Sequence, residues 1–474
     1  MHKKCSILAH AVRLTSLAAL AVPAGALAGG FSLNEQSASA MGVANAGSAA
    51  NPENASTVLF NPAGMSQLSG TNISFGAAVL DIDAEAKPES ISVTRQVPGI
   101  PVQPATAGGD IADPAVLPNF YMTHEVSDTI DVGFGIHAPY GLAADYDNGF
   151  AGRFFADKTE LTAIAFTPSI SVSNGNGLSM GAGINLIYAE GRLSRYQDVS
   201  GLVYQGALED GASQQVAFNR AKNATVYEPY ADIEGDDIGA TFRVGFLYEM
   251  TEMTQMGLTL QTGTELDLKG DATISGFPVL GTGQTTTLTE KVRVPLAIPE
   301  SATLGLRHRF NDAFTVLAGA TYAKWSRFEE LDIISREGAP GEVSSVSGYP
   351  YINHVTERWK NTWQFNLGGI WQATPAWAFK AGYAWDESPV DQYVTARIPS
   401  EDRHWLTLGA QWKDASSGWT LDAAVGTLIF ADDAKVNDRE YTHQNPTVPA
   451  SQAQYQGSYE LSAWSASVQV SKAF

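Results

Sequence analysis

Residues 30–69 read GFSLNEQSASAMGVANAGSAANPENASTVLFNPAGMSQLS. The stretch is rich in Ala, Ser, Asn and Gly, and Glu35 and Glu53 are its only charged residues. Few of its positions favour a strand, and no long amphipathic helix stands out. Small residues allow close packing inside an enclosing wall, and at Asn61-Pro62-Ala63-Gly64 proline fixes φ while glycine tolerates a turn. We therefore interpret residues 29–69 as a compact hatch that fills the lumen of a barrel formed by residues 70–474.

The first 28 residues have the features of a secretory signal peptide. A basic start, a short apolar middle and a small-x-small cleavage pattern stand at Lys3 and Lys4, Leu14–Ala24 and Ala26-Leu27-Ala28. The only cysteine, Cys5, lies inside this leader. We expect cleavage after Ala28, which leaves a mature chain that can form neither a disulfide nor a thiolate metal site.

The remaining chain alternates apolar and polar residues with a period of two. One apolar face holds Ile238, Ala240, Phe242, Val244, Phe246 and Tyr248. The same pattern recurs near residues 178–188, 406–412 and 464–474, with aromatic residues near the ends of the apolar faces. No run after the leader reaches the ~20 apolar residues of a membrane helix, so a membrane-spanning form must be a β-barrel. A soluble β-sandwich alternates similarly, but the leader and the aromatic ends favour a lipid-facing wall.

The connections between the expected strands support a barrel. We count fourteen strands, beginning near residues 70, 117, 129, 159, 177, 236, 254, 291, 313, 359, 376, 403, 418 and 459. Short turns alternate with long loops, which lie at roughly 84–116, 141–158, 197–235, 269–290, 333–357, 387–402 and 432–457. The sequence therefore predicts an all-β fold: a 14-stranded antiparallel transmembrane β-barrel, plugged by the N-terminal hatch, in the outer membrane of a Gram-negative bacterium.

Composition and motifs disfavour several other classes of function. The formal net charge of −21 argues against a nucleic-acid partner, because a phosphate backbone needs a basic surface. The eight histidines show no metal-binding spacing and no glycine loop suits a phosphate, so we expect no metal and no cofactor. Gly177-Leu178-Ser179-Met180-Gly181 fits a hydrolase motif, but it lies inside an alternating strand and not at a strand-to-helix turn.

Several motifs together resemble the FadL family of outer-membrane transporters, which carry long-chain fatty acids and, in some members, aromatic hydrocarbons. The resemblance spans the mature chain and is carried by Gly30-Phe31-Ser32-Leu33-Asn34-Glu35, Asn61-Pro62-Ala63, Pro139-Tyr140-Gly141-Leu142 with Gly152-Arg153, Trp325-Ser326-Arg327-Phe328, Asp386-Glu387-Ser388-Pro389-Val390 and Ile398-Pro399 through Asp402-Arg403 to Trp405. The family fold is a fourteen-stranded barrel with an N-terminal hatch. This agrees with the strand count.

The resemblance also implies a route for the ligand. A hydrophobic molecule lands among the outer loops, moves to a tighter site inside the barrel, and leaves sideways into the bilayer. Movement of the hatch near Phe31 opens the passage, and a kink in the third strand, here at Ala138-Pro139-Tyr140-Gly141, supplies the gap. Proline and glycine both weaken strand pairing, so this local sequence suits such a gap.

Individual residues take expected roles from the same resemblance. Arg195 matches an arginine that faces a fatty-acid carboxylate, while Asn61, Pro62 and Asp386 match hatch and wall positions near the lateral gap. The second basic contact of the family falls near Val355, beside His354, which leaves the carboxylate clamp incomplete.

The sequence leaves the ligand open. Long-chain fatty acids, alkanes and monoaromatic hydrocarbons all fit, and a plain porin or a barrel lipase remains an alternative. We expect a monomer that contacts a hydrophobic ligand and the lipid and lipopolysaccharide of the outer membrane.

Overall fold

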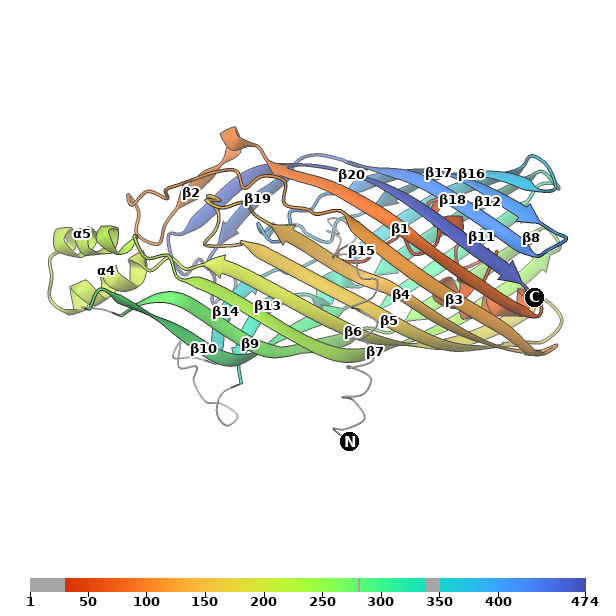
Figure 1. Ribbon diagram of the computed structural model, residues 1–474, viewed down its shortest axis with the longest axis horizontal. Coiled ribbons are helices and arrows are strands. Elements are labelled where there is room, and N and C mark those ends of the chain that lie inside the picture. Colours follow the sequence, from red (N-terminus) through yellow and green to blue (C-terminus); the bar gives the residue numbers. More distant parts are fainter. Residues whose placement is uncertain (1–29, 280–281, 337–349) are drawn as a thin grey trace.

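The computed structural model describes residues 30–279, 282–336 and 350–474 (Figure 1). The expected signal peptide lies outside the described residues. The helices are α2 (Ala38–Met41), α3 (Thr57–Phe60), α4 (Ser200–Glu209) and α5 (Gln214–Ala224), with 3₁₀ turns η1 (Pro62–Gln67), η2 (Pro88–Ser90) and η3 (Trp325–Arg327). None of the helices in these ranges is both long and apolar enough to cross a membrane.

Strands make up most of the chain. In order they are β1 (Thr71–Ala86), β2 (Ser92–Thr94), β3 (Ala115–Ser127), β4 (Ile130–Asp145), β5 (Lys158–Ser173), β6 (Leu178–Tyr196), β7 (Tyr230–Thr251), β8 (Thr254–Gln261), β9 (Thr264–Val279), β10 (Gln284–Ile298), β11 (Ser301–Arg309), β12 (Phe314–Ala323), β13 (Glu330–Ser335), β14 (Tyr351–Thr356), β15 (Thr362–Gln372), β16 (Trp377–Asp386), β17 (Arg403–Asp414), β18 (Trp419–Phe430), β19 (Ala434–Arg439) and β20 (Gln454–Ala473).

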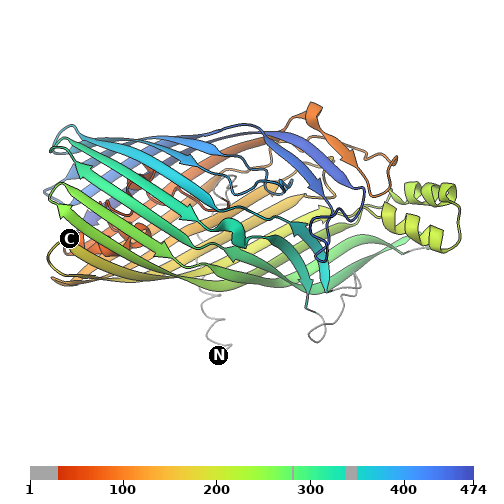
Figure 2. The same ribbon diagram turned by 180° about the vertical axis from the view of Figure 1, so that it is seen from behind.

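The strands close into an antiparallel barrel with fourteen strand positions, which confirms the predicted fold class. The wall closes where β1 pairs with β20, from Asn72 opposite Ala473 to Ala86 opposite Tyr459. Five positions are each divided between two consecutive strands: β8 and β9, β10 and β11, β12 and β13, β14 and β15, and β18 and β19. Seen from behind, the strands run obliquely along the long axis of the barrel (Figure 2).

Several of the expected long loops contain strands or helices in the structure. The expected loops at 84–116, 333–357 and 432–457 contain β2, β14 and β19. Residues 269–290, expected as a loop, extend the wall as the long hairpin of β9 and β10, whose pairing reaches Val279 opposite Gln284. Its residues alternate between buried and exposed over much of this length, as in a strand. Many of them are polar, and this polar composition led to the prediction of a loop. Residues 197–235 contain the helices α4 and α5, which project from one end of the barrel (Figures 1 and 2).

The outer face of the wall is apolar. Exposed large side chains on neighbouring strands include Phe75, Phe242, Leu367, Leu408, Val425 and Val468. Trp371, Trp377 and Trp419 stand near the short turns at one end of this band, and Trp363 and Trp464 stand farther along the barrel. An apolar band flanked by aromatic residues suits a wall that faces lipid.

The hatch fills the end of the lumen opposite α4 and α5 (Figure 1). The Asn61 side chain donates hydrogen bonds to Ala49 O (2.6 Å) and Phe246 O (3.0 Å), and its own oxygen accepts one from the Ala63 amide (3.0 Å). This turn approaches the wall at Gly245 so closely that an added Cβ would lie 1.9 Å from the Asn61 oxygen. Glycine at this wall position is therefore required for the hatch to dock.

A buried ion cluster also fastens the hatch to the wall. Lys380 of β16 lies 2.5 Å from the hatch carboxylate of Glu53 and 3.4 Å from Asp422 of β18. Its ammonium group also donates to Ser39 O at 3.1 Å. Removing one member of such a buried cluster leaves the others uncompensated, which costs about 3–5 kcal/mol.

Candidate functional site

The third strand of the wall, β4, loses one neighbour partway along its length. Its pairing with β3 ends at Phe120 opposite Ile136, and its register with β5 shifts between His137 and Tyr140. The irregularity thus coincides with the Ala138–Gly141 segment that the sequence singles out. Proline at position 139 has no amide proton to donate, so a regular ladder cannot continue here.

The N-terminus of the hatch pairs with β4 at this interruption. Leu33 donates its amide to Pro139 O (3.1 Å), and Gly141 donates to Phe31 O (3.0 Å). The side chain of Gln36 donates to Ala138 O at 2.6 Å. The backbone groups that β3 leaves unpaired are in this way satisfied by the hatch.

Phe31 is the centre of an aromatic collar formed by Tyr140, Trp325, Phe328 and Trp359. Ring centroids of the four collar residues lie 4.7–5.9 Å from that of Phe31, which is 1% exposed. Trp325 and Phe328 come from the break between β12 and β13, and Trp359 comes from the break between β14 and β15. Breaks in the divided wall strands therefore supply three of the four collar residues, and β4 supplies Tyr140. The sequence analysis singled out Trp325 and Phe328 as a motif but missed Trp359.

An apolar pocket of about 50 Å³ lies on one side of Phe31. Its lining is mostly aliphatic and includes Leu161, Leu193, Leu268, Val294 and Leu296. Arg397, from the segment between β16 and β17, is the cation in this lining. The lining also includes the carboxylates of Glu160 and Glu234, which pair with Lys158 (3.0 Å) and Arg192 (3.3 Å). An apolar pocket with one cationic group can accept an elongated apolar molecule that has an anionic end.

A larger outer cavity, of about 500 Å³, lies among the loops and also includes Arg397 in its lining. Arg195, the arginine predicted from the sequence, lines this cavity as well. Its guanidinium donates to Asn353 Oδ1 (2.7 Å) and to Phe154 O (3.1 Å). Val355 and His354 lie in the same lining, so the outer cavity holds all the positions named for the carboxylate clamp.

Arg397 supplies a second buried cation that the sequence analysis missed. It is 3% exposed, and its guanidinium donates hydrogen bonds to uncharged oxygens, including Thr159 Oγ1 (3.1 Å) and Ser194 O (3.1 Å). Burial, and then the charge of Arg195, lower the pKa of Arg397 to about 10, so it stays cationic at neutral pH. Arg397 directly precedes the Ile398-Pro399 motif, and this position beside a family motif is the sequence signal that could have identified it.

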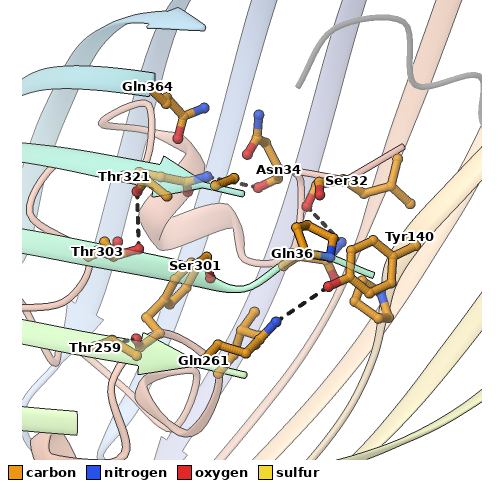
Figure 3. Close-up of a pocket in the computed structure, with 18 of the residues that line it drawn as sticks. Ser32, Asn34, Gln36, Tyr140, Thr259, Gln261, Ser301, Thr303, Thr321 and Gln364 are labelled. Atoms are coloured by element: carbon orange, nitrogen blue, oxygen red, sulfur yellow. Dashed lines mark hydrogen bonds between the residues drawn. The ribbon is translucent and has the colours of Figure 1, made fainter. Parts of the chain in front are cut away.

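A third cavity, the lower cavity, lies on the hatch side of the collar and measures about 230 Å³. Figure 3 shows polar side chains from several wall strands converging on it, including Thr259, Gln261, Thr303 and Thr321. Gln261 donates to Tyr140 Oη (3.4 Å), and the hydroxyls of Thr303 and Thr321 are 3.1 Å apart. Ser32 and Leu33 line the lower cavity while Phe31 lines the apolar pocket, so Phe31 stands between the two.

The remaining predicted residues are distributed around the hatch. Asp386 lines the lower cavity and accepts two hydrogen bonds from Arg403, at 2.8 and 3.0 Å. Asn61 and Pro62 lie against Gly181 and Gly245 of β6 and β7. They therefore seat the hatch, whereas Phe31 to Gln36 are the hatch residues that meet the interrupted β4 strand.

Comparison with known proteins identifies the family. The model for outer membrane protein transport proteins (OMPP1/FadL/TodX) matches residues 19–474. The chain belongs to the FadL/TodX family. It is 30% identical to the 47 kDa outer membrane protein of Pasteurella multocida, over 83% of this chain and 86% of that protein. It is 26% identical to the long-chain fatty acid transport protein of Escherichia coli, over 88% and 91% of the two chains.

The same architecture occurs in solved structures. A FadL homologue of Pseudomonas aeruginosa superposes with a TM-score of 0.79 at 22% identity, over 94% of this chain and all of that one. As a FadL/TodX channel, this protein is an outer-membrane transporter of hydrophobic small molecules in a Gram-negative bacterium, and it is not an enzyme. Family membership thus confirms the predicted resemblance, location and general function.

Proposed function

We propose that this protein takes up long-chain fatty acids and releases them sideways between β3 and β4. The observation that carries the proposal is the apolar pocket whose lining includes the buried guanidinium of Arg397. A buried guanidinium is well suited to an ionised carboxylate, because an unpaired charge in an apolar site is costly. The relative from E. coli, named as a long-chain fatty acid transport protein, supports this substrate class.

The dimensions of the pocket support a moving hatch. The apolar pocket holds about 50 Å³, whereas a dry cavity of about 150 Å³ accepts benzene. A ligand therefore needs side chains to move, and Phe31 borders both the apolar pocket and the interrupted β4 strand. Withdrawal of Phe31 with the hatch N-terminus would enlarge the pocket and expose the edge of β4 in one step.

The polar lining of the lower cavity supports lateral release. An apolar chain that continued through the hatch would meet the hydroxyls and amides shown in Figure 3. Returning about fifteen methylenes to a watery environment at ~0.8 kcal/mol each would cost roughly 12 kcal/mol. Release into lipid avoids most of this cost. The pairing between β3 and β4 ends at Ile136, so the interruption lies in the lipid-facing wall itself.

Mass spectrometry of ligands retained by the protein purified from the outer membrane, followed by competition binding, tests the substrate class. We expect long-chain fatty acids to be retained and to compete more strongly than alkanes of equal length or toluene. Equal binding of alkane and acid, or stronger binding of toluene, would instead favour hydrocarbon uptake by the same route. The monomeric state and the contact with lipid and lipopolysaccharide stay predictions.

A further inference from the structure

Four potential metal ligands meet at the outer end of the barrel. They are Glu330 and Asp332 of β13, His354 of β14, and His443 of the segment between β19 and β20. One ligand atom from each of the four lies within 4.8 Å of the others. Three separate segments of the chain thus place two imidazoles and two carboxylates around one point.

Asp332 bridges the two histidines. Its Oδ1 lies 2.5 Å from His354 Nδ1, and its Oδ2 lies 2.7 Å from His443 Nδ1. Glu330 Oε2 lies 3.8 and 3.4 Å from the same two nitrogens. Asp332 and His354 are almost fully buried, and the ring of Tyr351 stacks on that of His443 at 3.7 Å. The Nδ1 atoms of both rings therefore point at the carboxylates from fixed orientations.

The hydrogen bonds of Thr356 define which nitrogen of His354 carries a proton. The Thr356 hydroxyl must donate to Pro446 O (2.8 Å), because a carbonyl oxygen can only accept. Its oxygen is then an acceptor for His354 Nε2, 3.0 Å away. A neutral His354 with its proton on Nε2 presents a lone pair at Nδ1, facing a carboxylate oxygen at 2.5 Å. Two lone pairs at that distance require a cation between them, or a proton on either the ring nitrogen or the carboxyl oxygen.

We propose that Glu330, Asp332, His354 and His443 bind a divalent transition-metal ion, with Zn²⁺ as the best fit. Imidazole nitrogen and carboxylate oxygen are both good Zn²⁺ ligands, whereas Ca²⁺ and Mg²⁺ prefer oxygen alone. Ligand atoms about 2.0–2.1 Å from a tetrahedral ion stand about 3.3 Å apart. The present nitrogen-to-oxygen separations of 2.5–3.8 Å bracket this value. The Nε2–H of His354 on Thr356 supplies the outer hydrogen bond that ligating histidines usually make.

Metal binding at this place would fasten a loop over the outer cavity. His443 belongs to the segment that connects β19 to β20, and residues 439–444 line the cavity that contains Arg195. A metal ion would tie this segment to the β13–β14 hairpin through strong bonds at one point. The inference is independent of the substrate class, since it concerns the loop over the cavity and not the ligand inside it.

Isothermal titration of the full-length mature protein, stripped with a chelator and kept in detergent, tests the site with Zn²⁺ and with Ca²⁺. We expect one Zn²⁺ per chain, no comparable Ca²⁺ binding, and a visible absorption band from bound Co²⁺. His443→Ala should weaken Zn²⁺ binding by roughly 100-fold or more, and Thr356→Val by about 10–100-fold. His404→Ala, a histidine on the outer face of β17, is the matched control and should bind Zn²⁺ as the wild type does.

Hydrogen exchange provides a second readout, because it localises the effect of Zn²⁺ to one segment of each protein. Zn²⁺ should slow exchange in residues 440–450 of the wild type and of His404→Ala, and should leave it unchanged in His443→Ala. Absence of stoichiometric Zn²⁺ binding to the wild type would overturn the proposal. Unchanged binding in both His443→Ala and His354→Ala would also overturn it, because the ion would then lie elsewhere.

Discussion

Replacing Arg397 with glutamine should separate charged from neutral ligands. The guanidinium is 3% exposed, borders both the apolar pocket and the outer cavity, and donates to neutral wall oxygens. A bound fatty acid would therefore place its carboxylate against a cation that hydrogen-bonds uncharged groups. A hydrogen bond to a charged group contributes about 1.5–3 kcal/mol. At 1.4 kcal/mol per factor of ten, loss of one such bond weakens binding by roughly 10–150-fold.

Competition binding with a long-chain fatty acid and its methyl ester measures this effect. The ester has the same chain but no charge, so its affinity for Arg397→Gln should stay within a few-fold of wild type. Arg195→Ala should weaken acid binding less, because Arg195 lines only the outer cavity and is held by Asn353 and Phe154. An equal loss for acid and ester in Arg397→Gln would refute the reasoning, because it would mean that Arg397 only supports the pocket.

Other predictions concern the collar, the hatch, the outer cavity and the leader. Phe31→Ala should destabilise the packing of the hatch against the collar by about 3–5 kcal/mol, the usual loss for a buried Phe→Ala change. The same variant should bind ligand faster in stopped-flow experiments. Lys380→Met should weaken the attachment of the hatch to the wall and raise ion conductance in planar bilayers. Unchanged conductance would contradict the inference that the Lys380 ion cluster holds the hatch in place. Burial raises the pKa of Asp438 to about 6, so this carboxyl is neutral below that pH and competes less for Arg397. Fatty-acid binding should therefore tighten as pH falls toward 6, and Asp438→Asn should flatten the profile. N-terminal sequencing of outer-membrane material should begin just after Ala28, and retention of the leader would contradict this.

The barrel could be predicted from local patterns. Period-two alternation shows which strand face contacts lipid, and this depends only on residues adjacent in the chain. Fourteen strands and a hatch therefore followed from the sequence together with the family resemblance. The prediction of a loop at residues 269–290 was wrong. The strands β9 and β10 continue there beyond the apolar band, where a polar sequence does not distinguish a strand from a loop.

The site could be predicted only in part. The Pro139–Gly141 interruption is local in sequence, and so it was found. Arg397 and Trp359 meet the apolar pocket and Phe31 only through the closure of the barrel, so spacing along the chain gave little indication of them. The metal cluster shows the same limit, because Asp332 and His443 are 111 residues apart.

Uptake of labelled fatty acid by cells that produce Gly141→Trp tests the central claim of lateral release most directly. Gly141 is buried at the β4 interruption, where its amide pairs with Phe31, so a bulky side chain should obstruct the gap. Gly369→Trp is the matched control, because an added Cβ at this wall glycine meets open space. The account predicts that Gly141→Trp assembles as a heat-modifiable barrel and still binds fatty acid but loses most uptake, while Gly369→Trp transports normally. Wild-type uptake by a correctly folded Gly141→Trp barrel would contradict release at this place.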